Sequence, residues 1–158
     1  MSGSTVFHWW SIAAIVLIAG PWVAAVRADD DKIDVTVLAI LASDKNNVVD
    51  EQLKDIAKEI QKNYPTLTGF RVERVTKKPV KVGDKDSFQL VDEKDVVVAL
   101  SQRDPVTGRV TVTIKPPTVG DITYACCCGK FFPVITRYMT KENDRLIVAV
   151  MVKPCHKK

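Results

Sequence analysis

The segment IDVTVLAILAS, residues 33–43, carries most of the architectural information in this 158-residue chain. Every second side chain along it is apolar, at Ile33, Val35, Val37, Ala39 and Leu41. The opposite face also becomes apolar toward the end of the segment, at Leu38, Ile40 and Ala42. A strand that is apolar on both faces is normally central in a sheet and covered by a helix. We therefore expect a buried strand here.

An amphipathic helix at about residues 50–63 is predicted directly after this strand. Asp50 is a candidate N-cap, and Glu51 is favourable near the positive end of a helix. Pro65 ends the helix. Its apolar side chains recur at the spacing of one helical face, at Leu53, Ile56, Ala57 and Ile60. This pattern predicts that the helix packs on one face of the sheet.

The chain after Gly69 is typical of β-structure. The predicted strands are Phe70–Val82, Asp86–Leu90, Asp95–Arg103, Arg109–Lys115, Asp121–Cys128, Phe131–Thr140 and Arg145–Lys153. Within the first of them, the alternation of apolar and polar side chains shifts by one residue. This shift indicates either a bulge near Arg74 or an interruption at Pro79. Residues 104–108 (DPVTG) have the Pro and Gly of a hairpin turn.

The fold class that follows is α+β. We expect a mainly antiparallel sheet of about six to eight strands, with the one helix packed on one face. The closing strand, RLIVAVMVK, is apolar on both faces like the first. The two are therefore expected to pair in the middle of the sheet. Residues 29–158 are predicted to be a single domain.

The N-terminal segment points to export. Residues 6–26 (VFHWWSIAAIVLIAGPWVAAV) contain no Lys, Arg, Asp or Glu, and Val26-Arg27-Ala28 offers a small-residue cleavage site. One interpretation is a signal peptide, residues 1–28, cut after Ala28. The alternative is an uncleaved helix that anchors the protein in a membrane through residues 6–26. Either way the domain is expected outside the cytosol, periplasmic or secreted.

The charge pattern argues against a nucleic-acid partner. Residues 29–158 carry 22 Lys and Arg side chains against 19 Asp and Glu, a net charge of +3, and the two signs are interleaved. Nucleic-acid binding favours a basic face with aromatic platforms. The aromatic residues of this part are scattered, so we expect no nucleic acid among its partners.

The four cysteines of the chain have an unusual arrangement. Cys126, Cys127 and Cys128 are consecutive, and Cys155 lies beside His156. Export favours disulfides, and the simplest pairing joins Cys155 to one of the three. The alternative is a metal site for Cu(I) or zinc, formed by Cys126, Cys128, Cys155 and His156, because soft thiolates select these ions. A thiol-redox role is a third, weaker hypothesis.

No catalytic motif is found in the sequence. His156 is the one histidine after residue 28, and there is no G-x-S-x-G, H-E-x-x-H or glycine-rich phosphate loop. The acidic pairs Asp84/Asp86 and Asp92/Glu93 fall in predicted turns, where carboxylates usually accept hydrogen bonds from backbone amides. We therefore expect neither an enzyme nor a bound cofactor.

Two resemblances agree with this interpretation. ILAS, NNVVDEQLKDIAKEIQKNYP and the closing RLIVAVMVKP resemble small exported bacterial α+β domains of uncharacterised function. The opening IDVTVLAILAS and FPVITRYMTKENDRLIVAVMVKP are similar, at the two ends only, to strand and hairpin patterns of the bacterial secretins. These resemblances imply a non-catalytic cell-envelope or secreted module that binds a protein or associates with itself. The alternative is an exported thiolate metal-binding protein.

Overall fold

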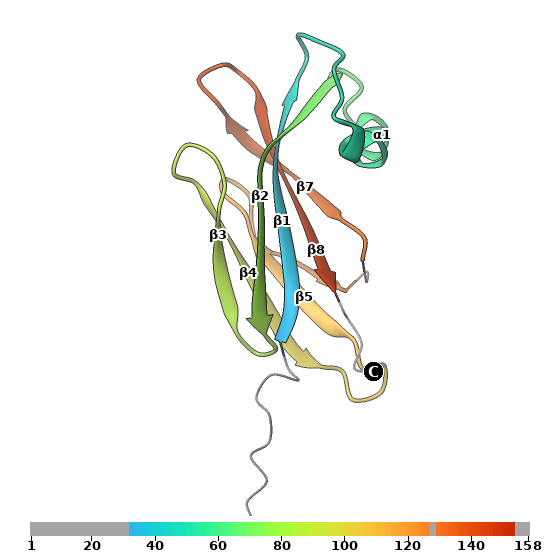
Figure 1. The fold of residues 1–158 in the computed structure, drawn as a ribbon, viewed down its shortest axis with the longest axis vertical. Helices are drawn as coiled ribbons and strands as arrows, with labels where there is room; N and C mark the ends of the chain where they lie inside the picture. The colour runs from blue at the N-terminus through green and yellow to red at the C-terminus, as the bar shows by residue number, and fades with distance from the viewer. Residues whose placement is uncertain (1–31, 127–128, 154–158) are drawn as a thin grey trace, which may run out of the picture.

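The computed structural model describes residues 32–126 and 129–153. They form eight strands in two antiparallel sheets, with one short helix (Figure 1). The first sheet has the order β2-β1-β8-β7 and consists of β1 (Lys32–Ser43), β2 (Gly69–Lys81), β7 (Phe132–Met139) and β8 (Arg145–Lys153). The second has the order β3-β4-β5-β6 and consists of β3 (Lys85–Gln89), β4 (Asp95–Arg103), β5 (Val110–Lys115) and β6 (Ile122–Ala125). The architecture is thus α+β-like and mostly antiparallel.

The first and last strands pair in the middle of the first sheet, as predicted. The ladder between β1 and β8 runs from Asp34 opposite Lys153 to Ala42 opposite Arg145. Both strands are buried on both faces along most of this ladder. Their long apolar runs therefore mark the two strands that are covered by another layer on each side.

Two separate cores explain this double burial. One face of the first sheet packs on the second sheet, with Val35 and Val148 against residues such as Phe88 and Val112. The other face packs on the helix, through a cluster that includes Leu38, Leu53, Ile56, Ile60 and Ile147. The prediction of one sheet was wrong in this respect, because β3–β6 form a second layer. A strand with one apolar face suits either position.

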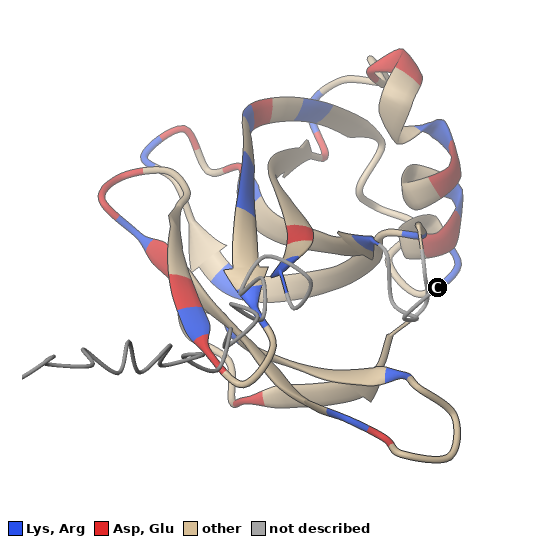
Figure 2. Ribbon diagram, turned by 60° about the horizontal axis from the view of Figure 1, so that its bottom comes forward, with Lys and Arg blue, Asp and Glu red and all other residues tan. Residues whose placement is uncertain are grey.

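The helical segment lies close to its predicted place. It begins with a 3₁₀ turn, Glu51–Leu53, and continues as α1 (Lys54–Gln61). Charged positions of both signs cover its ribbon in Figure 2. Asp50 precedes the segment, but its side chain does not cap it. That carboxylate instead accepts a 2.7 Å hydrogen bond from the backbone N–H of Val72 in β2. Asp50 thus occupies the N-cap position, as predicted, but its side chain makes no capping bond.

The irregularity predicted in β2 is a bulge near Arg74. Ala39 pairs with Arg74 and Ile40 with Val72, so Glu73 is the extra residue. Pro79 does not interrupt the strand, since it pairs with Asp34. The predicted hairpin turn between β4 and β5 is also confirmed, by hydrogen bonds that join Asp104 to Arg109 and Gly108.

The N-terminal predictions fall outside the described residues. These are the signal peptide or anchor helix, the cleavage site after Ala28 and the membrane contact through residues 6–26. Within residues 32–126 and 129–153, no helix is long and apolar enough to cross a membrane.

Candidate functional site

The end of the molecule that is uppermost in Figure 1 is formed by loops (Figure 1). We call it the loop end and define it by residues 44–50, 62–68, 90–94 and 140–144, which connect β1 to the helix, α1 to β2, β3 to β4 and β7 to β8. Residues at this end help to line three hollows of the described structure, which have volumes of about 210, 330 and 220 Å³. The start of β1 at Lys32 lies at the opposite end (Figure 1).

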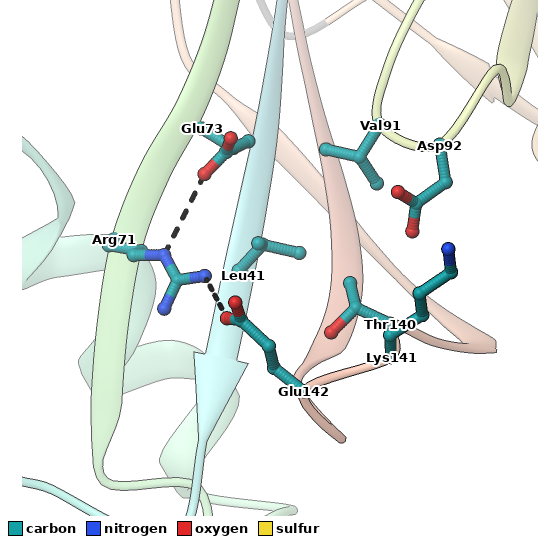
Figure 3. Close-up of a pocket in the computed structure, with 8 residues that line it drawn as sticks. All are labelled: Leu41, Arg71, Glu73, Val91, Asp92, Thr140, Lys141 and Glu142. Atoms are coloured by element: carbon teal, nitrogen blue, oxygen red, sulfur yellow. Dashed lines mark hydrogen bonds and ion pairs between the residues drawn. The ribbon is translucent and has the colours of Figure 1, made fainter.

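The first hollow, of about 210 Å³, lies where the two sheets meet at the loop end. Figure 3 shows Arg71 beside Glu73 and Glu142, and Lys141 on the same side as Asp92. The complete lining is Leu41, Arg71, Glu73, Val91, Asp92, Thr140, Lys141 and Glu142. The β2 bulge explains part of this arrangement, because the inserted residue is Glu73. The hollow is polar and contains charges of both signs.

Arg71 is the centre of an ion-pair network at this hollow. Its Nη1 lies 2.9 Å from the Oδ2 of Asp144, whose side chain is 5% exposed. Glu142 lies 3.3 Å from the guanidinium and Glu73 lies 3.7 Å from it. Desolvation lowers the pKa of Arg71, but the three carboxylates, Asp144 foremost, outweigh it and raise the pKa above its usual value. The network fixes the β7–β8 turn against β2.

The turn between β3 and β4 is held in an uncommon conformation. Its two central residues, Asp92 and Glu93, have φ of 48° and 59°. Positive φ at both central positions is the geometry of a type I′ hairpin turn, which favours Gly, Asn and Asp. The hydroxyl of Tyr138 in β7 donates a 2.8 Å hydrogen bond to Asp92. That bond, then desolvation and the charge of Asp92, raise the pKa of Tyr138. The bond joins the two sheets at the loop end.

Apolar side chains are exposed beside the other two hollows. Tyr64 and Met139 line the hollow of about 330 Å³, and Val48, 70% exposed, lines the hollow of about 220 Å³. They are three of the five large hydrophobic residues that are exposed in the described part of the chain. The loop end thus combines charged hollows with uncovered apolar surface.

Cys126 is the one predicted cysteine that falls within the described residues. It follows β6, is 3% exposed, and packs in the core between the sheets. Its sulfur lies 4.0 Å from the carbonyl oxygen of Val152 near the end of β8. The backbone N–H of Gly129 donates a 3.2 Å bond to that same oxygen. Cys126 is therefore held beside the last residues of β8.

The remaining predicted site residues, Cys127, Cys128, Cys155 and His156, fall outside the described residues, so the disulfide and the metal site stay predictions. Among the residues that are described, no three His, Cys, Asp or Glu side chains are grouped to hold a metal ion.

The two acidic pairs singled out in the sequence lie in different surroundings. Asp86 lies within β3, not in a turn, where it accepts a bond from the backbone of Ser87 and pairs with Lys78. Asp92 lies in the turn that was predicted for it and lines the first hollow. Asp92 and Glu93 thus lie at the loop end, whereas Asp86 does not.

Comparisons with protein-family models, with curated proteins and with solved structures found no match for this chain. The resemblances to small exported bacterial domains and to secretin strand patterns stay predictions. Arg71, Asp144, Tyr64 and Arg145 were missed by sequence reasoning, because they belong to segments that only the fold brings together.

Proposed function

We propose that this chain is an exported, non-catalytic binding module and that the loop end is its interaction surface. The observation that carries the proposal is the gathering of three hollows and three exposed apolar side chains at one end. Exposed apolar side chains bordered by polar groups are typical of sites where proteins bind partners. The partner we propose is a protein of the cell envelope or a second copy of this chain.

The backbone at this end supports the proposal. Asp92, Glu93 and Asn143 have positive φ and lie in the two turns beside the first hollow. Side chains other than glycine are strained in this conformation, and such strain clusters at binding and active sites. A rigid framework holds the turns, because Arg71 and Tyr138 join them to the sheets.

The direction of β1 fits export by either N-terminal route. The strand has 12 residues, which at about 3.3 Å per residue extend about 40 Å. Its first residue, Lys32, is at the end remote from the loop end (Figure 1). The proposed surface therefore lies at the end of β1 that is remote from Lys32, which suits export whether the N-terminal segment is cut after Ala28 or retained as an anchor.

We also propose that a disulfide joins Cys126 to Cys155. Cys126 is buried beside Val152, and Cys155 follows Val152 by three residues, which span at most about 11 Å. A bond from Cys126 to the adjacent Cys127 would need a strained ring. Peptide mapping under non-reducing conditions tests the pairing. Fragmentation of the linked peptide, which contains residues 126–128 together, should place the alkyl label on Cys127 and Cys128 and the link to Cys155 on Cys126. A link from Cys155 to Cys127 or Cys128 would contradict the proposal.

Site-specific photo-crosslinking tests the interaction surface. A photoreactive residue replaces Val48 at the loop end in one variant and Val106 in the other. Val106 is a matched control, because it is 91% exposed and lies in the β4–β5 turn at the opposite end of the sheets. In intact cells we expect a discrete adduct from the Val48 variant alone. Equal adducts from both positions, or none from Val48, would contradict the proposed surface.

Export is tested separately by the intact mass of the protein purified from its native cells. The expected mass is that of residues 29–158, less two hydrogens for the disulfide. The full-length mass in a membrane fraction would assign the anchor instead. Full-length protein in the cytosol would disprove export.

A further inference from the structure

The hollow of about 330 Å³ has features that a general protein-binding surface does not require. It is lined by the end of β1, the segment between α1 and β2, and the β7–β8 hairpin. The complete lining is Ala42, Asp44, Tyr64, Thr66, Leu67, Met139, Asn143 and Arg145. Its volume is at the lower limit for small-molecule sites, about 300 Å³. A ligand of one or two residues in size suits it.

Arg145 supplies a positive charge to this hollow. In the sheet it pairs with Ala42 on one side and Met139 on the other. Its Nε is buried without a hydrogen-bond partner, and its guanidinium carbon lies 5.9 Å from the centre of the Tyr64 ring. A buried donor left without a partner is unfavourable. A bound carboxylate would satisfy this guanidinium with charge-assisted hydrogen bonds.

Asp44 supplies a negative charge to the same hollow. The ion pairs of the described residues include neither Asp44 nor Arg145, so the two charges are not neutralised by each other. A carboxylate and a guanidinium that line one small hollow without pairing with each other are complementary to a ligand that carries both charges. An α-amino acid has a carboxylate and an ammonium group on a single carbon atom.

Apolar side chains form another part of the lining. Leu67 is buried, and Tyr64 and Met139 are 38% and 37% exposed. A ligand side chain that covered Tyr64 and Met139 would remove apolar surface from water. Methionine adapts to side chains of differing shape. This lining favours aliphatic and aromatic ligands over polar ones.

From these groups we infer that the hollow is a binding site for a free α-amino acid with an apolar side chain. Arg145 binds the α-carboxylate, Asp44 binds the α-ammonium group, and the ligand side chain packs on Tyr64 and Met139. This inference goes beyond the proposed function, since it needs no protein partner.

Calorimetric titration of the purified full-length or exported protein tests the inference. The ligands are leucine, phenylalanine, leucine methyl ester, which lacks the carboxylate, and N-acetyl-leucine, which lacks the ammonium group. We expect leucine and phenylalanine to bind with Kd below about 1 mM, and each modified ligand to bind at least about tenfold more weakly than leucine. These ligands test both charges without any change to the protein.

Variants then assign the charges to residues. Arg145→Gln should weaken leucine binding at least about tenfold. Asp44→Asn should weaken leucine binding and leave N-acetyl-leucine binding unchanged. Arg109→Gln and Asp55→Asn are the controls, because both residues are exposed and neither lines the hollow.

Three outcomes would overturn the inference. They are the absence of leucine and phenylalanine binding at about 1 mM, undiminished leucine binding by Arg145→Gln, and N-acetyl-leucine binding as tight as that of leucine. The last result would indicate recognition of a peptide C-terminus. All three leave the crosslinking test of the loop end unaffected, so the two proposals fail separately.

Discussion

In the Arg71–Asp144 pair, we expect the loss of the arginine to lower the stability of the fold more than the loss of the aspartate. Asp144 is 4% exposed, and the guanidinium 2.9 Å away is the one charged group paired with it in the described residues. Arg71 has a side chain that is 44% exposed and two further carboxylates, Glu73 and Glu142, near it. Loss of the arginine therefore leaves a buried, uncompensated charge, whereas loss of the aspartate leaves a partly hydrated one.

Removal of one partner from a fully buried pair costs about 3–5 kcal/mol. Because water reaches one side of this pair, we expect the lower limit, about 3 kcal/mol, for Arg71→Met. Asp144→Asn should cost about 1 kcal/mol, the net value of one hydrogen bond. The double variant, which has no buried charge, should be about as stable as Asp144→Asn or slightly less stable, so the two residues are strongly coupled.

Urea unfolding of the four proteins at neutral pH, followed by circular dichroism, measures these differences. The control is Lys115→Met, which removes a 2.6 Å ion pair with Asp121 between two half-exposed side chains. This change should cost less than about 1 kcal/mol. The reasoning is refuted if Arg71→Met costs no more than the control, or if the two single effects simply add in the double variant.

Three further predictions concern the disulfide and the β3–β4 turn. Replacing Cys126 and Cys155 by serine should lower the free energy of unfolding by about 3.5 kcal/mol, because the bond closes a loop of about 30 residues; a loss below about 1 kcal/mol in non-reducing urea unfolding would contradict the pairing. Glu93→Gly should raise that free energy by about 0.5 kcal/mol, since glycine adopts positive φ without strain, and a destabilised variant would contradict this account of the turn. The raised pKa of Tyr138 means that its bond to Asp92 stabilises the fold fully below about pH 10 and is lost as pH rises through the folded-state pKa. Asp92→Asn should shift the ultraviolet titration of one tyrosine to lower pH, and an unchanged titration would exclude the bond.

Much of the first sheet was predictable because its sequence signals are local. The two-faced apolar runs of β1 and β8 require cover on both sides, and the parity slip beside Arg74 requires an extra residue. Each inference depends on side-chain alternation within one strand. The structure confirms the central pairing and the bulge.

The division into two sheets could not be derived in the same way. Val96 and Val98 of β4 alternate with half-buried residues, as do Val110 and Val112 of β5. This alternation shows that one face of each strand is buried, but it does not show which layer of the protein covers that face. The alternation also does not show that β3 pairs with β4 and not with β2.

Asp50 and the loop end show a second limit of sequence reasoning. A carboxylate before a helix caps it in many proteins, but the N–H of Val72 in the neighbouring strand is the partner here. The first hollow similarly takes Leu41, Arg71, Asp92 and Glu142 from four separate segments. No motif connects these positions along the chain, so only the folded backbone identifies them.

The β1–β8 ladder also has a consequence for the timing of folding. It pairs Asp34 with Lys153 and Ala42 with Arg145, so no part of it can form until the chain has been synthesised as far as β8. The hairpins of the second sheet involve nearer neighbours and are complete earlier. Until β8 has been synthesised, one edge of β1 therefore stays unpaired, and an unpaired strand edge is prone to aggregation. A ribosome that stalled before β8 would release a chain that cannot close its central layer.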